Sequence, residues 1–186
     1  MASLEIEPPA AHEYDPYYAS YIDRVEGKRL ADIMRRQRAL VVELLADLSP
    51  EQAGYRYAPD KWSIREMIGH MIDTERVFVY RALSIARGEK QSLPGFDQDE
   101  YVVTGGFDSR SVGSLSGEYE AVRNATLAFF DSLDEASWLK TGMANEVSVS
   151  VRAIGYIIPG HETHHLSILR ERYLSGDWNP VEDPVG

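Results

Sequence analysis

Apolar residues recur at helical spacing in four stretches of this 186-residue chain. In the first stretch, from about Lys28 to Leu48, they fall three or four positions apart and so line one face of an amphipathic helix. Ser49-Pro50 follows directly, and a proline disfavours helical backbone at the residue before it. We therefore predict a first long helix that ends near Leu48.

A capping box marks the start of the second predicted helix. In Ser63-Ile64-Arg65-Glu66, the serine and the glutamate side chains can satisfy each other's free backbone N–H groups. The helix should continue to Arg87, because Gly88 can then end it in a left-handed conformation.

Two more helices follow from the later spacing. The third is predicted from apolar positions that alternate steps of four and three along one stripe: Leu115, Tyr119, Val122, Thr126, Phe129 and Leu133. Before the fourth, Val147, Val149 and Val151 alternate with polar residues, as in a short strand. We expect extended chain there and a helix from about Ser150.

The segments around these helices complete a prediction of fold class and domains. Residues 1–26 are rich in proline, tyrosine and acidic groups and are predicted to form an extended arm, residues 27–175 a helical bundle, and residues 176–186 a C-terminal tail. Between Gly88 and Leu115, about 25 residues show no sustained period, and connections of that length are uncommon in compact domains. We expect a crossover, a pocket lid, or both. The predicted fold is all-α, a four-helix bundle with a long crossover connection.

Composition narrows the possible partners. The formal net charge is −11, so the surface should repel nucleic acid and anionic membranes. No apolar run reaches the roughly 20 residues that span a bilayer, and the N-terminus lacks a signal-peptide pattern, so we expect a cytoplasmic protein. The chain has no cysteine. Any catalytic sulfur would therefore have to arrive with a substrate.

Candidate chemistry concentrates in the string His161-Glu162-Thr163-His164-His165. His161 and His165 are four positions apart, so they project from one helix face, and apolar residues continue that face on both sides. Buried imidazoles without partners are costly, and a metal ion is a common partner. We predict that this pair binds a divalent metal. His164 either supports the site or replaces one of the two.

The string also matches H-E-x-x-H, the zinc-protease pattern. A protease of this type needs a third ligand, which in the extended motif follows the second histidine. Only 21 residues follow His165, with Glu171 and Glu182 as their only glutamates. We therefore disfavour the protease interpretation.

His70 can supply the third ligand from the second helix. It shares a stripe with Met67 and Thr74, and it would complete a three-histidine site with one open position, which is typical of catalytic zinc. Asp73 can hydrogen-bond an imidazole. Glu162 is the candidate catalytic base. An interpretation of Glu162 as an ordinary solvated residue on the helix surface is equally compatible with the sequence. Imidazole ligands suit zinc, nickel, copper or iron, and we expect zinc first and nickel next.

Two groups of residues resemble the DinB/YfiT-like superfamily of metalloenzymes. They are Lys61-Trp62-Ser63-Ile64-Arg65-Glu66 leading into His70 and Asp73-Thr74-Glu75-Arg76, and, much later, Gly160-His161-Glu162 with His164-His165. The resemblance covers roughly residues 17–174. It implies a four-helix bundle with a long crossover, a divalent metal on His70, His161 and His165, and a homodimer.

Members of this superfamily similar to this chain act as metal-dependent hydrolases, or as transferases and isomerases that use a small cellular thiol. We therefore expect a metal-dependent enzyme that transfers a low-molecular-weight thiol to an electrophilic small-molecule substrate. A hydrolase that uses a metal-bound water is the first alternative. The second is a protein that binds a metal or a small ligand without catalysis.

Overall fold

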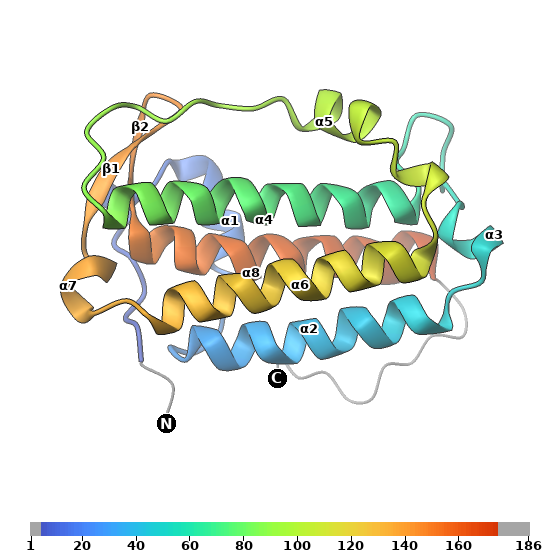
Figure 1. Ribbon diagram of the computed structural model, residues 1–186, viewed down its shortest axis with the longest axis horizontal. Coiled ribbons are helices and arrows are strands. Elements are labelled where there is room, and N and C mark those ends of the chain that lie inside the picture. The colour runs from blue at the N-terminus through green and yellow to red at the C-terminus, as the bar shows by residue number, and fades with distance from the viewer. Residues whose placement is uncertain (1–4, 175–186) are drawn as a thin grey trace.

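Four long helices form the body of the protein. The computed structural model describes residues 5–174, so the predicted tail at residues 176–186 lies outside it. The helices are α2 (Leu30–Asp47), α4 (Ile64–Ala86), α6 (Val112–Asp131) and α8 (Val151–Ile168). Helix α2 contacts α6 and α8, and α4 contacts the same two helices from the other side. The predicted all-α four-helix bundle is confirmed (Figure 1).

The connection between α4 and α6 spans the length of the bundle. Because of it, α4 and α6 run in the same direction, opposite to α2 and α8 (Figure 1). The long crossover is therefore confirmed. It contains the short helix α5 (Gln98–Gly105), which was not predicted, and a 3-10 turn at Phe107–Ser109. Asp97 begins α5 because its side chain accepts hydrogen bonds from two backbone N–H groups of the first turn.

The ends of α4 follow the predicted local chemistry. Ser63 Oγ accepts a hydrogen bond from the backbone N–H of Glu66 at 3.1 Å, and Glu66 Oε2 accepts one from the backbone N–H of Ser63 at 2.8 Å. Gly88 follows the last turn with φ of +90°, a conformation that a side chain would strain. The predicted capping box and helix end are confirmed.

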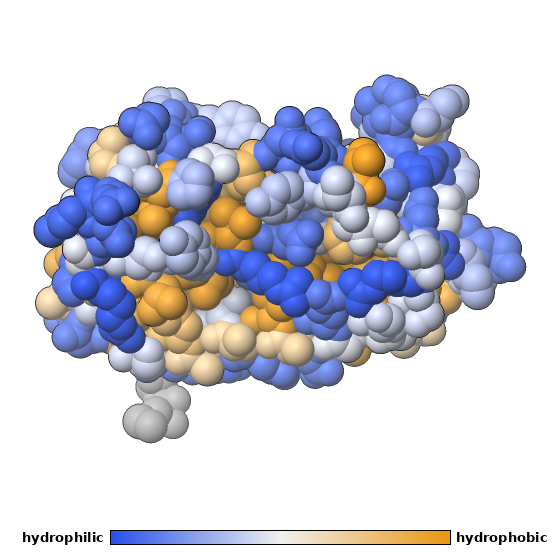
Figure 2. Space-filling view, turned by 45° about the horizontal axis from the view of Figure 1, so that its top comes forward, coloured by the Kyte–Doolittle hydropathy of each residue, from blue (hydrophilic) through white to orange (hydrophobic). Residues whose placement is uncertain are grey.

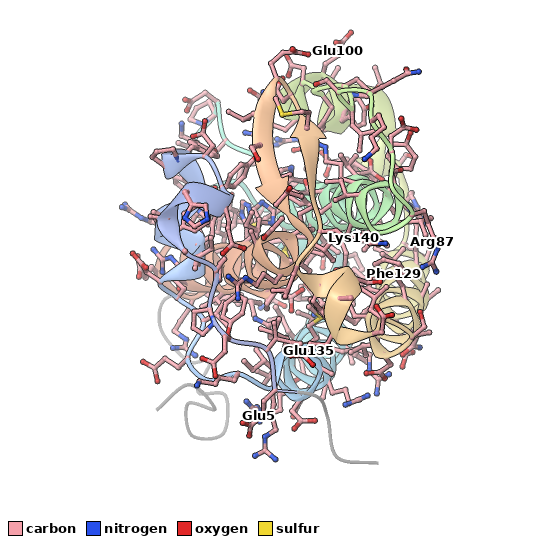
Figure 3. The ribbon with its side chains drawn as sticks, turned by 90° about the vertical axis from the view of Figure 1, so that its left-hand side faces the viewer. Glu5, Arg87, Glu100, Phe129, Glu135 and Lys140 are labelled. Atoms are coloured by element: carbon pink, nitrogen blue, oxygen red, sulfur yellow. The ribbon has the colours of Figure 1, made fainter. Side chains whose placement is uncertain are left out.

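A β-hairpin precedes α8. Strand β1 (Thr141–Ala144) pairs antiparallel with β2 (Val147–Ser150), and the short helix α7 (Glu135–Trp138) leads into it. The extended stretch predicted near Val147 is confirmed, although Val151 already belongs to α8. Figure 3 shows the hairpin over one end of the bundle, between the N-terminal segment and the crossover. Leu93 of the crossover forms an isolated bridge with Ala144.

The N-terminal segment is more regular than the extended arm that we expected. It contains 3-10 turns at Ala11–Glu13 and Pro16–Tyr18, followed by the short helix α1 (Ala19–Ile22). This helix packs on α8, and the backbone carbonyl of Tyr21 lies directly against Gly160. A Cβ atom at Gly160 would overlap that carbonyl, so the absence of a side chain there permits the contact.

The surface is mostly polar, with some large apolar side chains left exposed. These are Leu83, Val103, Leu139 and Met143. On the face shown in Figure 2, apolar surface gathers toward one half of the molecule and is crossed by a band of hydrophilic side chains. None of the helices in residues 5–174 is both long and apolar enough to cross a membrane.

Gly160→Ala should displace α1 from α8. The added methyl group overlaps the Tyr21 backbone, so we expect a loss of about 1–3 kcal/mol in the free energy of unfolding, as for other overpacked positions. Urea unfolding measures the loss, and limited proteolysis should cleave the variant faster near Tyr21.

Gly117→Ala is the matched control, because nothing lies within 4 Å of a Cβ there. It should be neutral or stabilise α6 by up to about 1 kcal/mol. Equal stability of the two variants would contradict the proposed contact.

Candidate metal centre

Three histidines from two helices meet in the interior. His70 lies on α4, while His161 and His165 lie one turn apart on α8. The Nε2 atom of His161 is 3.1 Å from that of His70 and 3.0 Å from that of His165. All three residues are buried. The structure thus brings together the three residues that the sequence singled out, although they are separated by up to 95 positions in the chain.

The spacing of these nitrogens fits a divalent ion. Tetrahedral ligation with metal–nitrogen bonds of about 2.0–2.1 Å separates neighbouring ligand nitrogens by about 3.3 Å. The observed separations of 3.0 and 3.1 Å are close to that value. A neutral imidazole carries either an N–H or a lone pair at Nε2, so His161 Nε2 can form a good hydrogen bond with only one of its two neighbours, whereas a cation between the three rings satisfies a lone pair from each. The donor set therefore suits a metal such as zinc or nickel.

Burial keeps these imidazoles neutral. It lowers the pKa of His70 to about 4, with a smaller contribution from the charge of His164. Burial also lowers the pKa of His161 and of His165 well below the ordinary value, and the neighbouring histidines add to this effect. A metal requires the unprotonated imidazole. The site therefore offers three free lone pairs at neutral pH without first losing protons.

The Nδ1 atoms of the histidine rings, which point away from the three converging Nε2 atoms, have different surroundings. Thr74 Oγ1 lies 3.4 Å from His70 Nδ1. Asp73, which we expected beside an imidazole, instead accepts a hydrogen bond from Arg76 at 3.3 Å. His165 Nδ1 is buried and has no hydrogen-bond partner among the described residues. Thr74 rather than Asp73 therefore orients His70.

Two aromatic side chains cover the cluster. The ring of Tyr21 meets His161 edge-on at 5.4 Å between centroids, and the ring of Trp62 lies 4.7 Å from that of His70. His164, which was a possible ligand, is half-buried and packs its ring against Tyr21 rather than joining the three converging nitrogens. The approach to the histidines thus has aromatic walls, one of them from the N-terminal segment.

A buried layer of charged and polar groups lies beside the histidines. Arg123 of α6 is completely buried, and its guanidinium donates to Glu75 of α4 at 2.7 Å and to Glu162 of α8 at 2.5 Å. The hydroxyl of Tyr119 donates to both oxygens of Glu162 at 3.0 Å. Gln37 of α2 accepts a longer hydrogen bond from Arg123 at 3.4 Å. Each long helix contributes at least one member.

This polar layer divides the apolar core into two parts. One cluster contains Met34, Phe78, Leu127 and Ile158, and the other contains Val41, Met71, Leu115 and Leu169. On α2, α4 and α6, the side chains of Gln37, Glu75 and Arg123 lie between residues of the two clusters. The bundle therefore has one level at which its helices are joined by charge rather than by apolar packing.

Glu162 belongs to this layer, so its interpretation as a solvated helix residue is wrong. The side chain is buried, and burial raises its pKa to about 7, although the positive charge of Arg123 opposes the shift. Glu162 and His161 line the same small cavity, whose volume of about 10 Å³ has room for about one water molecule. The carboxylate is thus next to the metal centre. Its assignment as the catalytic base stays a prediction.

Arg123 was not singled out from the sequence, and Glu75 was named only within the motif Asp73-Thr74-Glu75-Arg76, although a signal for a buried ion pair was present. Arg123 lies four positions after Tyr119, on the stripe of the third predicted helix. Glu75 lies four positions after Met71 and three before Phe78, both of which are buried. A charged residue at a core position of an amphipathic helix requires a buried partner. Two such positions on different helices therefore indicated an ion pair.

Comparisons with known proteins identify the family and agree with the fold. The family model of the DinB superfamily matches residues 33–169. YfiT from Bacillus subtilis, described as a probable metal-dependent hydrolase with an unusual four-helix bundle topology, has a similar structure. The TM-score is 0.64 and the identity 12%, over 87% of this chain and 89% of that one.

A second similar structure is a mycothiol-dependent maleylpyruvate isomerase. Its TM-score is 0.60 and its identity 12%, over 74% of this chain and 58% of the isomerase. At these identities the likeness concerns the fold. No curated protein sequence matches the chain.

Arg123→Met should destabilise the bundle severely. It leaves two buried carboxylates without their cation, and removal of one partner from a buried ion pair costs about 3–5 kcal/mol. Denaturant unfolding of the metal-free protein measures this loss. Adding Glu75→Gln and Glu162→Gln to the variant removes the stranded charges and should restore part of the stability. If the triple variant were less stable than Arg123→Met alone, charge would not be the cause.

Proposed function

This chain belongs to the DinB superfamily, and from that premise we propose that it is a metal-dependent enzyme that transfers a small cellular thiol to an electrophilic small molecule. The observation that carries the proposal is the convergence of three buried, neutral imidazoles on one point. Structural zinc sites are closed by four protein ligands, whereas catalytic sites keep a position for a substrate. Three histidines without a fourth described ligand favour the catalytic type.

His70, His161 and His165 would hold the ion, with zinc as the first choice and nickel next. A divalent cation on three neutral ligands keeps its full charge, which lowers the pKa of a thiol or a water molecule beside it toward neutrality. Elemental analysis of the purified protein would identify the ion, because imidazole ligands suit several transition metals.

One observation supports a thiol as the nucleophile: a protein of similar fold is mycothiol-dependent. The chain contains no cysteine, so the sulfur would have to come from a cosubstrate, although this absence fits a hydrolase equally well. In the proposed transfer the thiol gives up its proton, its sulfur forms a bond to an electrophilic carbon, and the bond to the leaving group breaks with that group taking the electron pair. No oxidant or reductant is needed.

The chain's own side chains would bind and orient the reactants. The rings of Tyr21 and Trp62 limit the entry of water and favour a substrate with an apolar or planar part. Glu162 would accept the proton of the thiol, since its pKa of about 7 suits proton exchange at neutral pH. Arg123 and Tyr119 would hold that carboxylate in place.

Hydrolysis is the second candidate, favoured by the similarity to a probable metal-dependent hydrolase. The same cation would then act on water, and Glu162 would accept a proton from water. Binding of a metal or a small ligand without catalysis is the third. We also propose a homodimer, for which the exposed apolar residues Leu83, Leu139 and Met143 provide a candidate surface.

The three ligand histidines should each be essential for metal retention. Expression with zinc, nickel, manganese and iron supplied, followed by elemental analysis, should find about one ion per chain. Alanine at His70, His161 or His165 should weaken binding by at least about 100-fold, because removal of a ligand opens the coordination shell. His164→Ala is the matched control and should retain the ion. A wild-type protein that purifies without metal, or loss of the ion only in His164→Ala, would contradict the assignment.

The metal-loaded protein should consume a low-molecular-weight thiol in the presence of an electrophile. Loss of free thiol is measured in parallel with the hydrolysis of ester and amide substrates. Glu162→Gln should retain the metal but slow the reaction by about 10²–10⁴-fold, the usual contribution of a general base. Thiol loss that persists unchanged in His161→Ala rules out transfer at this site. Metal-dependent ester or amide hydrolysis without thiol loss assigns the protein to the second candidate.

A further inference from the structure

Arg81 is a second deeply buried arginine, and it lacks the carboxylates that Arg123 has. Its side chain lies on the face of α4 that also carries His70, Thr74 and Phe78, near the opposite end of the helix. Arg81 is 4% exposed. Within residues 5–174, no carboxylate lies within the 4.0 Å that defines an ion pair with Arg81, whereas Arg123 pairs with two glutamates.

The contacts of Arg81 use only part of its hydrogen-bonding capacity. Its Nη2 donates to the backbone carbonyl of Pro94 in the crossover at 2.8 Å. Its Nε is buried and has no partner among the described residues. The guanidinium carbon lies 5.6 Å from the ring centre of Phe78 and 5.8 Å from that of Phe96. Aromatic rings stabilise a cation, but they do not replace an anion.

The guanidinium borders a hollow at the end of the bundle. The hollow opens to solvent and lies between α4, α8, the hairpin and the N-terminal segment, and its enclosed part of about 10 Å³ has room for a group the size of a water molecule. Figure 3 looks onto this end, where the hairpin lies between the N-terminal segment and the crossover. Tyr18 and Ser148 also line the hollow. Burial raises the pKa of Tyr18, and Arg81 opposes this shift through its charge and a side-chain hydrogen bond.

We propose that Arg81 binds the carboxylate of a small-molecule ligand in this hollow, with the hydroxyl of Tyr18 as a second donor. A planar guanidinium pairs with a carboxylate through two parallel hydrogen bonds, and the unpaired Nε of Arg81 supplies one such donor. Burial strengthens the attraction because few water molecules compete. The subsite is separate from the three histidines, so it requires neither a metal nor the proposed thiol transfer.

The charge of the surroundings favours a monoanion over a phosphate. Asp15 lines the same hollow, so a dianion would meet stronger repulsion there. Asp15 itself is held elsewhere, because its Oδ1 accepts a hydrogen bond from the backbone N–H of Tyr17 at 2.8 Å. It caps the turn at Pro16–Tyr18 rather than neutralising Arg81.

The test is a titration of the metal-free, full-length protein followed by NMR of the arginine Nε–H groups. The Arg81 resonance is assigned by triple-resonance experiments and followed with acetate and succinate, with chloride at equal ionic strength as the reference and phosphate as the competing anion. We expect a saturable shift with the carboxylates, with a Kd in the millimolar range, and none with chloride. A shift that is linear for every anion, or larger for phosphate than for acetate, would overturn the proposal.

Variants separate ligand binding from the structural contact with Pro94. Tyr18→Phe leaves that contact intact and should weaken carboxylate binding by about 2- to 10-fold, the effect of one lost hydrogen bond. Arg87→Gln changes an exposed arginine at the end of the same helix and should leave binding unchanged. Asp15→Asn should not weaken binding. If that variant alone, without ligand, moved the Arg81 resonance as acetate does, Asp15 would be the native partner and the proposal would be wrong.

Discussion

The ion pairs of Arg123 constrain the whole bundle. The guanidinium is completely buried, so its charge must be balanced by Glu75 of α4 and Glu162 of α8 wherever the helices pack. Apolar packing tolerates small rotations and shifts of a helix, but hydrogen bonds between buried charges do not. Because Glu162 is adjacent to His161 and Glu75 lies five residues after His70, the same contacts set the rotation of both helices that carry the candidate metal ligands.

The local features of the fold were predictable because they depend on neighbouring residues. The capping box at Ser63, the helix end at Gly88 and the shared face of His161 and His165 each follow from spacings of four residues or less. Features that depend on distant partners were missed or misplaced. Strand β1 requires β2 and the bridge to Leu93, and Arg123 requires acidic residues 48 and 39 positions away.

The neighbours of His70 show that helical spacing alone does not identify which side chain contacts a histidine. Asp73 and Thr74 lie three and four residues after His70, and both steps return to nearly the same helix face. The structure places Thr74 Oγ1 near His70, whereas Asp73 forms an ion pair with Arg76. The wall formed by Tyr21 lies outside residues 33–169, which the DinB superfamily model matches.

The order of the helices along the chain has a consequence for how the candidate metal centre is assembled. The four long helices are synthesised in the order α2, α4, α6 and α8, so the helix that carries His161 and His165 comes last of the four. His70 therefore lacks both of its partner histidines until His161 has been added, 91 residues later. A chain that stops between these two positions would fold without two of the three candidate ligands.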